Sequence, residues 1–163
     1  AMKHPVAASV TGRSPLAVFL FFEKEQARVK KSLDRLIVDL ITLLEKSLVV
    51  FGPAPTDLVA PIDKTFALRV MVDKMKENLG TEPEAYAVLN AARTLAFEST
   101  GHHVSKIEGG RWAIEHGQPK RLLERAIAVQ QGERGDRPLT QEGRRFIHNV
   151  IHIIEDELSS RAR

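Results

Sequence analysis

The 163-residue sequence predicts an all-α fold, a single-domain bundle of about five to seven helices. Apolar residues recur at spacings of three and four along most of the chain, which is typical of helices buried on one face. No segment shows sustained alternation of apolar and polar residues, the pattern of a half-buried strand. Glycine, proline and capping residues divide the helical pattern into separate elements.

The N-terminal part carries one dense apolar run, Leu16–Phe22, which the charged residues Glu23–Glu25 follow directly. The run is much shorter than the roughly 20 residues that span a bilayer. We therefore expect an N-terminal helix over residues 14–33 that contains the run, and no association with a membrane. Residues 1–13 are expected to be disordered or derived from a tag, since the chain opens with Ala1-Met2.

A second helical pattern opens the main domain, which we place at residues 34–160. Its apolar positions are Leu33, Leu36, Ile37, Leu40, Ile41, Leu44 and Leu48. Leu48–Phe51 is the only strand candidate, and the helix can absorb it. The breakers in Gly52–Pro55 then end this helix. Pro61 suits the first turn of the next helix, which runs to about Asn78.

Two capping boxes announce the following helices. Thr81 with Glu84 predicts the start of a helix that ends at Thr100-Gly101, and Ser105 with Glu108 predicts the start of the next one. The apolar stripe of the first of these helices is Ala85, Val88, Leu89, Ala92, Leu95 and Ala96.

Two further helices complete the pattern, separated by the polar turn at residues 132–138. One runs from about Pro119 to Gln131, and the other begins at Thr140. The last helix is expected to bury Phe146, Ile147, Val150, Ile151, Ile154 and Leu158.

Composition excludes several classes of function. Lys and Arg outnumber Asp and Glu by only 24 to 21, which is too small an excess to indicate nucleic-acid binding. The chain has no cysteine, so disulfides and thiolate metal sites are excluded, and a cytoplasmic location is expected. It also has no Gly-rich phosphate loop and no G-x-S-x-G elbow.

Two cations lie where they could hold an anion. Lys106 follows the capping residue Ser105, so it stands beside the free N–H groups and positive dipole of a helix N-terminus. Arg93 falls at the edge of a buried stripe, where a guanidinium needs a carboxylate or phosphate partner. A solvated lysine and a structural ion pair remain the alternatives.

The histidines offer weaker patterns. His102-His103 are adjacent and fit a loop better than a metal site. His148 and His152 have the spacing of a helical metal pair, but no glutamate stands between them as in the metalloprotease motif. Arg145 and His152 have the loose spacing found in a class of helical ribonucleases, so acid–base cleavage of RNA is a remote alternative.

Trp112 is expected in the core, and the acidic run Glu155–Glu157 on a solvated helical face. Neither pattern indicates a ligand site.

Beyond these spacings, several segments in a fixed order resemble the C-terminal helical domain of the streptomycin–spectinomycin (aminoglycoside) adenylyltransferases. They are LxxAR at Leu89–Arg93, TGxxxSKxE at Thr100–Glu108, RWAIE at Arg111–Glu115, and LLERA at Leu122–Ala126 before Gly132. Upstream, the helix ending in VVFGP at Pro53 resembles the start of that domain. The likeness covers residues 34–158, roughly.

The resemblance implies a site. In this family an N-terminal nucleotidyltransferase half holds two magnesium ions on an aspartate pair after a Gly-Ser turn, and ATP and antibiotic lie between the halves. Arg93 and Lys106 match the basic residues that contact the ATP phosphates from the helical side. Glu82, Glu84 and Tyr86 are the candidates for substrate binding.

The sequence also departs from the family. It contains no Gly-Ser turn and no Asp-x-Asp, and Val129–Gln131 stands where the family has an aromatic residue. Gly109-Gly110 replaces better helix formers, at a cost of about 1 kcal/mol each.

We therefore expect a helical domain that binds ATP or an aminoglycoside, has a role connected with antibiotic resistance, and is not catalytic alone. No cofactor is expected for the chain by itself, and ATP and magnesium chemistry only if a nucleotidyltransferase domain is supplied. The alternative is an interaction protein that pairs with a nucleotidyltransferase chain or forms a homodimer.

Overall fold

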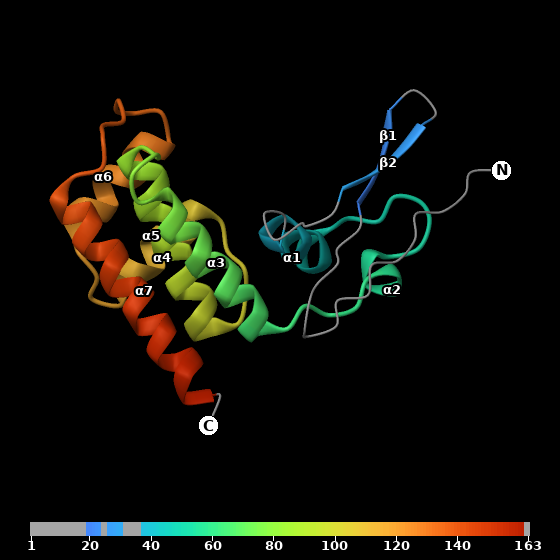
Figure 1. Ribbon diagram of the computed structural model, residues 1–163. Helices are drawn as coiled ribbons and strands as arrows, with labels where there is room; N and C mark the ends of the chain where they lie inside the picture. Colours follow the sequence, from blue (N-terminus) through green and yellow to red (C-terminus); the bar gives the residue numbers. More distant parts are fainter. Residues whose placement is uncertain (1–18, 24–25, 31–36, 162–163) are drawn as a thin grey trace. The chain divides into compact units, whose positions relative to one another are not determined.

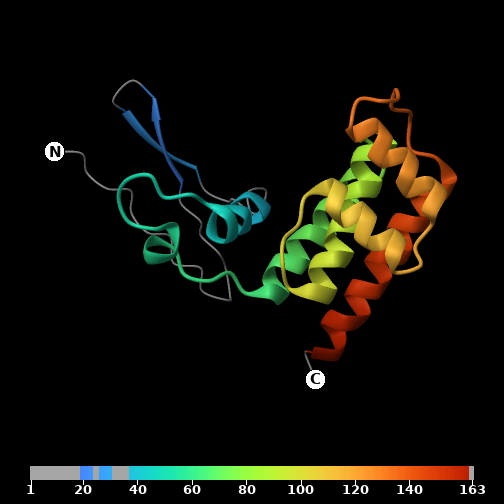
Figure 2. The same cartoon turned by 180° about the vertical axis from the view of Figure 1, so that it is seen from behind.

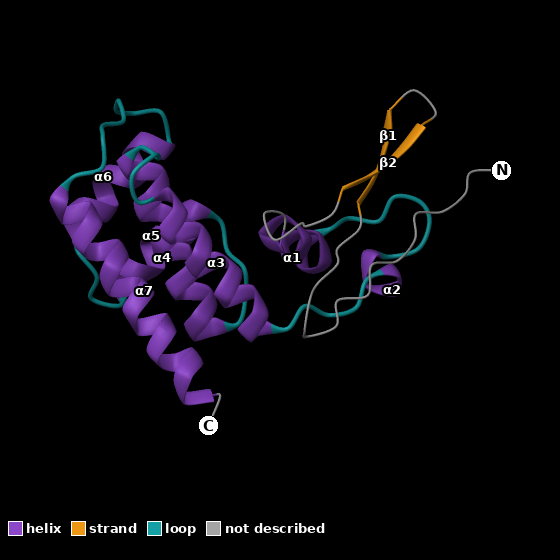
Figure 3. Cartoon of the chain, in the orientation of Figure 1, coloured by secondary structure: helices purple, strands orange, loops and turns teal. Residues whose placement is uncertain are grey.

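The computed structural model describes residues 19–23, 26–30 and 37–161, which form two strands and seven helices (Figures 1 and 3). The chain divides into two compact units, residues 1–70 and 71–163, and the boundary falls inside helix α3. The segment 1–13, expected to be disordered or tag-derived, lies outside the described residues.

The first unit contains a β-hairpin, so the helix expected over residues 14–33 is wrong for the described part of that range. Strand β1 (Phe19–Glu23) pairs antiparallel with β2 (Gln26–Lys30), with Phe19 opposite Lys30 and Glu23 opposite Gln26. The reason is local: phenylalanine-rich segments favour strands, and QARVK alternates polar and apolar residues over a stretch too short to register as sustained alternation.

Helix α1 (Ile37–Lys46) forms where a helix was expected and buries Ile37, Leu40 and Ile41. It ends before Leu48–Phe51, which the helix therefore does not absorb. The short helix α2 (Pro55–Leu58) was not predicted. Proline at its first position suits a helix start, and the Asp57 carboxylate accepts a hydrogen bond from the Ala54 N–H at 3.1 Å.

The remaining helices are α3 (Lys64–Asn78), α4 (Glu84–Thr100), α5 (Lys106–Glu115), α6 (Lys120–Gln130) and α7 (Gln141–Arg161). Seen from behind in Figure 2, α5 and α6 lie in front of α4 and α7. The all-α prediction is confirmed in this bundle. No helix in the described part of the chain is both long and apolar enough to cross a membrane.

Helix α4 is the centre of the second unit, because it packs against α5, α6 and α7. Its predicted stripe is buried, and residues on its other faces are buried too, which is typical of a central helix. The largest fully buried side chains of this unit are Val88, Leu89, Leu122, Leu123, Ile147, Val150 and Ile154.

Capping residues fix the ends of α4 and α5. Gly101 ends α4 in the left-handed conformation (φ 75°), as its position predicts. The capping box at α5 is confirmed, since Ser105 Oγ accepts from the Glu108 N–H at 3.2 Å and Glu108 Oε2 accepts from the Ser105 N–H at 2.8 Å. The box expected at Thr81 is wrong, because α4 begins directly after Pro83.

Candidate functional site

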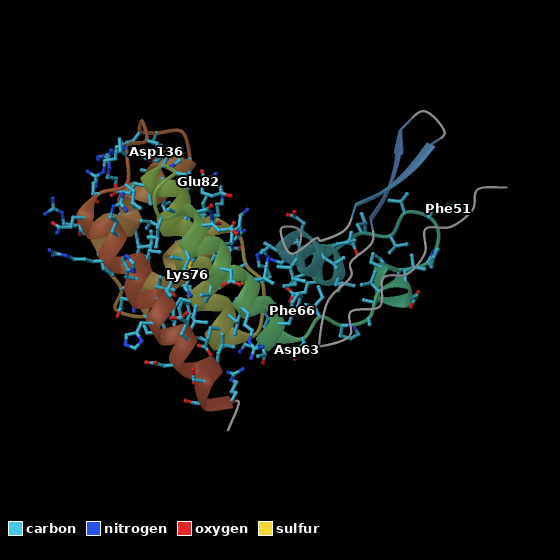
Figure 4. All side chains as sticks on the ribbon, viewed as in Figure 1. Phe51, Asp63, Phe66, Lys76, Glu82 and Asp136 are labelled. Atoms are coloured by element: carbon cyan, nitrogen blue, oxygen red, sulfur yellow. The ribbon has the colours of Figure 1, made fainter. Side chains whose placement is uncertain are left out.

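Four polar residues lie at spacings of four, four and three before and along α4: Glu82, Tyr86, Asn90 and Arg93. The helical spacings place Tyr86, Asn90 and Arg93 on one side of α4, whereas Glu82 lies just before the helix, and each of the four residues is half-buried. We call this set the polar stripe. One end carries a carboxylate and the other a guanidinium; Figure 4 labels Glu82 at the end of the bundle where α4 begins.

Lys106 reaches this stripe from the neighbouring helix. It is the first residue of α5, directly after the capping residue Ser105, and is itself half-buried. Its Nζ lies over the ring of Tyr86, 3.9 Å from the ring centroid, which is within the range of a cation–π interaction. The structure therefore brings Lys106 and Tyr86 together.

The surroundings of Lys106 alter its pKa. Burial lowers the pKa of the ammonium below 10.5, and the positive charge of Arg93 lowers it further, whereas the carboxylate of Glu82 raises it. The net direction is downward. The charges at both ends of the polar stripe, Arg93 and Glu82, therefore act on Lys106.

Arg93 is held by its own helix and by α5. Its Nη2 donates a hydrogen bond to Oδ1 of Asn90 at 2.8 Å. A Cβ atom added to Gly109 would lie 2.6 Å from the Arg93 Cα, closer than such atoms approach. Only glycine therefore allows α5 to pass this close to Arg93, and that crossing brings Lys106 near the guanidinium.

Glu84, a candidate for substrate binding, instead forms contacts inside the fold. Its side chain is 3% exposed and pairs with Arg137, and both the hydroxyl and the N–H of Thr140 donate to it. Burial alone raises the pKa of Glu84, but the hydrogen bonds from Arg137 and Thr140 outweigh burial and hold it below 4.5. Glu84 thus ties α4 to the segment before α7.

Two hollows lie among the described residues of the second unit, and Lys106 lines neither of them. A cleft of about 590 Å³ is lined by side chains that include Arg121, Arg125 and Arg134. A second hollow, of about 430 Å³, is lined by Glu82 and Asp136, among others. Of these two, the second includes a residue of the stripe, Glu82 at its acidic end.

The histidines are dispersed. His102 and His103 lie in the loop between α4 and α5, as expected, the first exposed and the second buried. His148 and His152 are exposed on α7, and His152 Nδ1 lies 3.1 Å from an Asp156 carboxylate oxygen. Among the described residues, no group of three or more His, Cys, Asp or Glu could hold a metal ion.

Three other features noted in the sequence are Trp112, the acidic run Glu155–Glu157 and Arg145. Trp112 is half-buried rather than in the core, and stacks on His116 with ring centroids 3.9 Å apart. Glu155 contacts Lys76 of α3 at 2.6 Å, while Glu157 contacts Arg161, so the acidic run faces different partners. Arg145 is exposed on α7.

Sequence reasoning missed two members of the site. Asn90 could have been found from its spacing, because it lies four residues after Tyr86 and three before Arg93. The part played by Gly109 has no local signal, because it depends on how closely α4 and α5 cross.

The fold and the site define a helical-bundle domain in which a polar stripe on the central helix meets a lysine at the start of its neighbour. A family model described as "Aminoglycoside adenylyltransferase, C-terminal domain" matches residues 57–156. The chain belongs to this family.

A solved structure is similar in fold. It is the crystal structure of spectinomycin adenyltransferase AAD(9) from Enterococcus faecialis with ATP and spectinomycin, with a TM-score of 0.56 and 18% sequence identity. The match covers 80% of this chain and 53% of that one, so the chain spans about half the length of this relative. No curated protein matches the chain.

Proposed function

We propose that this chain is the ligand-binding half of an aminoglycoside adenylyltransferase and that Arg93 and Lys106 bind the phosphates of ATP. The observation that carries the proposal is the position of Lys106, at the N-terminus of α5 and close enough to Arg93 for the two charges to interact. Free N–H groups, a helix dipole and two cations together favour a phosphate.

The acidic end of the polar stripe supports an aminoglycoside as the second ligand. Glu82 and Asp136 line the hollow of about 430 Å³ together with Arg137 and Arg144. Arg137 pairs with Glu84 and Arg144 donates to the Leu79 carbonyl, so the two carboxylates remain the acidic groups that border this space. Aminoglycosides are polycations, and carboxylates are their natural partners. Tyr86 stands between the two ends of the stripe. The carboxylate of Glu84 is occupied by Arg137 and Thr140 within the fold, so Glu84 is not part of the proposed site.

Binding without turnover is part of the proposal. The sequence has neither the Gly-Ser turn nor the Asp-x-Asp of a nucleotidyltransferase, and the described residues offer no metal site that fits magnesium. Transfer of an adenylyl group would need a nucleotidyltransferase domain. Since ATP is a cytoplasmic metabolite, the proposal implies a cytoplasmic protein that contributes to antibiotic resistance only together with such a domain.

Calorimetric titration with ATP, with streptomycin and with spectinomycin tests the proposal. Lys106→Met should weaken ATP binding about tenfold or more, the loss expected for one charge-assisted contact. Lys120→Met is the matched control, because Lys120 is also the first residue of a helix but is exposed and pairs with Glu124 at 3.7 Å. It should bind ATP as the wild type does.

Two results would contradict the proposal. One is no heat with any of the three ligands at millimolar concentration. The other is an equal loss of ATP affinity in the Lys106 and Lys120 variants, which would indicate attraction by general positive charge.

A second candidate function rests on an exposed apolar segment. Leu48, Val50 and Phe51 have 88%, 90% and 99% of their surface exposed, and Figure 4 labels Phe51. Adjacent exposed apolar side chains are typical of a surface that contacts another protein. We therefore propose, as the alternative, an interaction protein that forms a homodimer through Leu48–Phe51.

Sedimentation at two protein concentrations distinguishes this alternative. A homodimer should dissociate on dilution, and Phe51→Asp should leave a monomer at both concentrations. A wild-type protein that is monomeric at both concentrations would remove the homodimer.

A further inference from the structure

Lys106 lies where three features of the fold disfavour an ammonium group. It begins a helix, whose dipole is positive at that end. It is half-buried, so it loses part of its hydration, and the guanidinium of Arg93 repels it. A lysine chain is long and has four rotatable bonds, so it could turn away into solvent. Something must therefore hold the ammonium at this place.

Tyr86 supplies the contact. The Lys106 Nζ lies 3.9 Å from the centroid of its ring, over the face, where the ring carries negative potential. The ring belongs to α4, the central helix of the bundle, and Ala85 and Ala87 beside it are buried. The ring is therefore a firm support for the ammonium. The carboxylate of Glu82 also favours the ammonium, but Glu82 lies in the segment before α4.

We propose that Tyr86 is a positioning residue, whose ring holds the Lys106 ammonium in place for an anionic ligand. This inference rests on the proposed binding of ATP phosphates by Lys106. The face of an aromatic ring is only a weak hydrogen-bond acceptor, so the ammonium keeps N–H donors available for phosphate oxygens. Ordering the side chain in advance also lowers the entropy cost of binding.

The proposal changes the part assigned to Tyr86. As a substrate-binding candidate it would stack its ring on a ligand, but Lys106 already covers one face of that ring. Tyr86 therefore acts on the ligand through Lys106.

The first test needs no ligand. Protein labelled with ¹³C at lysine Cε is observed by NMR, and the Lys106 signal is identified by its loss in Lys106→Met. Ring current should shift this signal in the wild type and in Tyr86→Phe, which keeps the ring. The shift should disappear in Tyr86→Leu, which keeps an apolar side chain without a π face. An unchanged Lys106 signal in Tyr86→Leu would overturn the inference.

The second test is ATP affinity by calorimetry. Tyr86→Phe should bind ATP as the wild type does, and Tyr86→Leu should lose about threefold to tenfold, as expected for loss of a cation–π contact. In a Lys106→Met background, Tyr86→Leu should cause no further loss, because Tyr86 acts through the lysine.

The outcomes separate the two proposals. Wild-type affinity in Tyr86→Leu, together with weak binding by Lys106→Met, would remove the positioning role and keep the phosphate site. Equal loss in the Phe and Leu variants would assign the effect to the hydroxyl and also overturn the inference. Wild-type affinity in Lys106→Met would remove the phosphate site itself, even if the NMR shift followed the ring.

Discussion

Two charged residues of α4 and α5 show how surroundings decide what a side chain can do. Glu84 is more deeply buried than Lys106, yet its contacts stabilise its charged form and the pKa falls below 4.5. Lys106 is only half-buried, but its surroundings disfavour its charged form. A charged group whose hydrogen bonds are made within the fold stabilises the structure, whereas a charge that the fold disfavours is typical of a ligand site.

The pKa of Glu84 predicts how stability changes with pH. Because the pKa is lower in the folded chain than the ordinary 4.5, the stabilisation is complete above about pH 4.5. It is then lost as the pH falls through the folded pKa. Glu84→Gln should lower the free energy of unfolding at pH 7 by about 1–3 kcal/mol and flatten this acid dependence. Urea unfolding followed by circular dichroism at several pH values measures both effects.

Glu155→Gln is the matched control for Glu84. Glu155 also forms an ion pair between helices, with Lys76, but both side chains are about half exposed. An exposed pair contributes little, so this variant should keep the wild-type acid dependence. The same flattening in both variants would contradict the importance of burial at Glu84.

At the scale of helices, the crossing of α4 and α5 depends on two adjacent glycines with different neighbours. A Cβ on Gly109 would lie 2.6 Å from a backbone atom, the Arg93 Cα, which can move only with α4. A Cβ on Gly110 would lie 2.9 Å from Cδ2 of Leu89, the end of a flexible side chain. The sequence predicted only that Gly109 and Gly110 lower the helix propensity of α5. The structure shows why the cost is accepted: α4 and α5 cross too closely for a Cβ atom at Gly109.

Gly109→Ala should therefore destabilise the protein more than Gly110→Ala does. We expect a loss of about 1–3 kcal/mol at Gly109, the usual cost of overpacking, and a smaller loss at Gly110, where improved helix propensity of about 1 kcal/mol offsets part of the strain. Thermal unfolding measures the difference. Gly109→Ala should also weaken ATP binding, since it moves Arg93 from Lys106. Equal stability of the two variants would contradict this account of the crossing.

The two expected capping boxes show which features of a helix can be predicted from the sequence. The capping box of Ser105 with Glu108 was predicted because both partners lie within one helical turn. The box at Thr81 was wrong because Glu84 found partners 53 and 56 residues away, Arg137 and Thr140. Tertiary contacts outweighed a local pattern.

The same distinction between local patterns and tertiary contacts applies to the candidate site. Arg93 and Lys106 were predicted from their places at a stripe edge and a helix start and from the family resemblance, whereas the contact of Lys106 with Tyr86 depends on the α4–α5 crossing. No spacing within the sequence reports that crossing, because the residues that create it lie in different helices.

At the scale of the whole molecule, the balance of charges predicts how magnesium affects ATP binding. The chain has 24 Lys and Arg against 21 Asp and Glu, and no described group of carboxylates could bind a metal ion. A magnesium ion on ATP cancels part of the negative charge that Lys106 and Arg93 would attract, and the described residues offer no metal site in return. Removing magnesium with EDTA should therefore tighten ATP binding by about threefold to tenfold at constant ionic strength.

The opposite effect of magnesium would be as informative. An adenylyltransferase that holds the metal on its own carboxylates gains affinity when magnesium is present, because the ion bridges protein and phosphates. In this chain Lys106→Met should reduce the difference between the two conditions, and added salt should reduce it further by screening. Tighter binding with magnesium would show that the chain itself supplies metal ligands, and would contradict the proposal that it binds ATP without reacting.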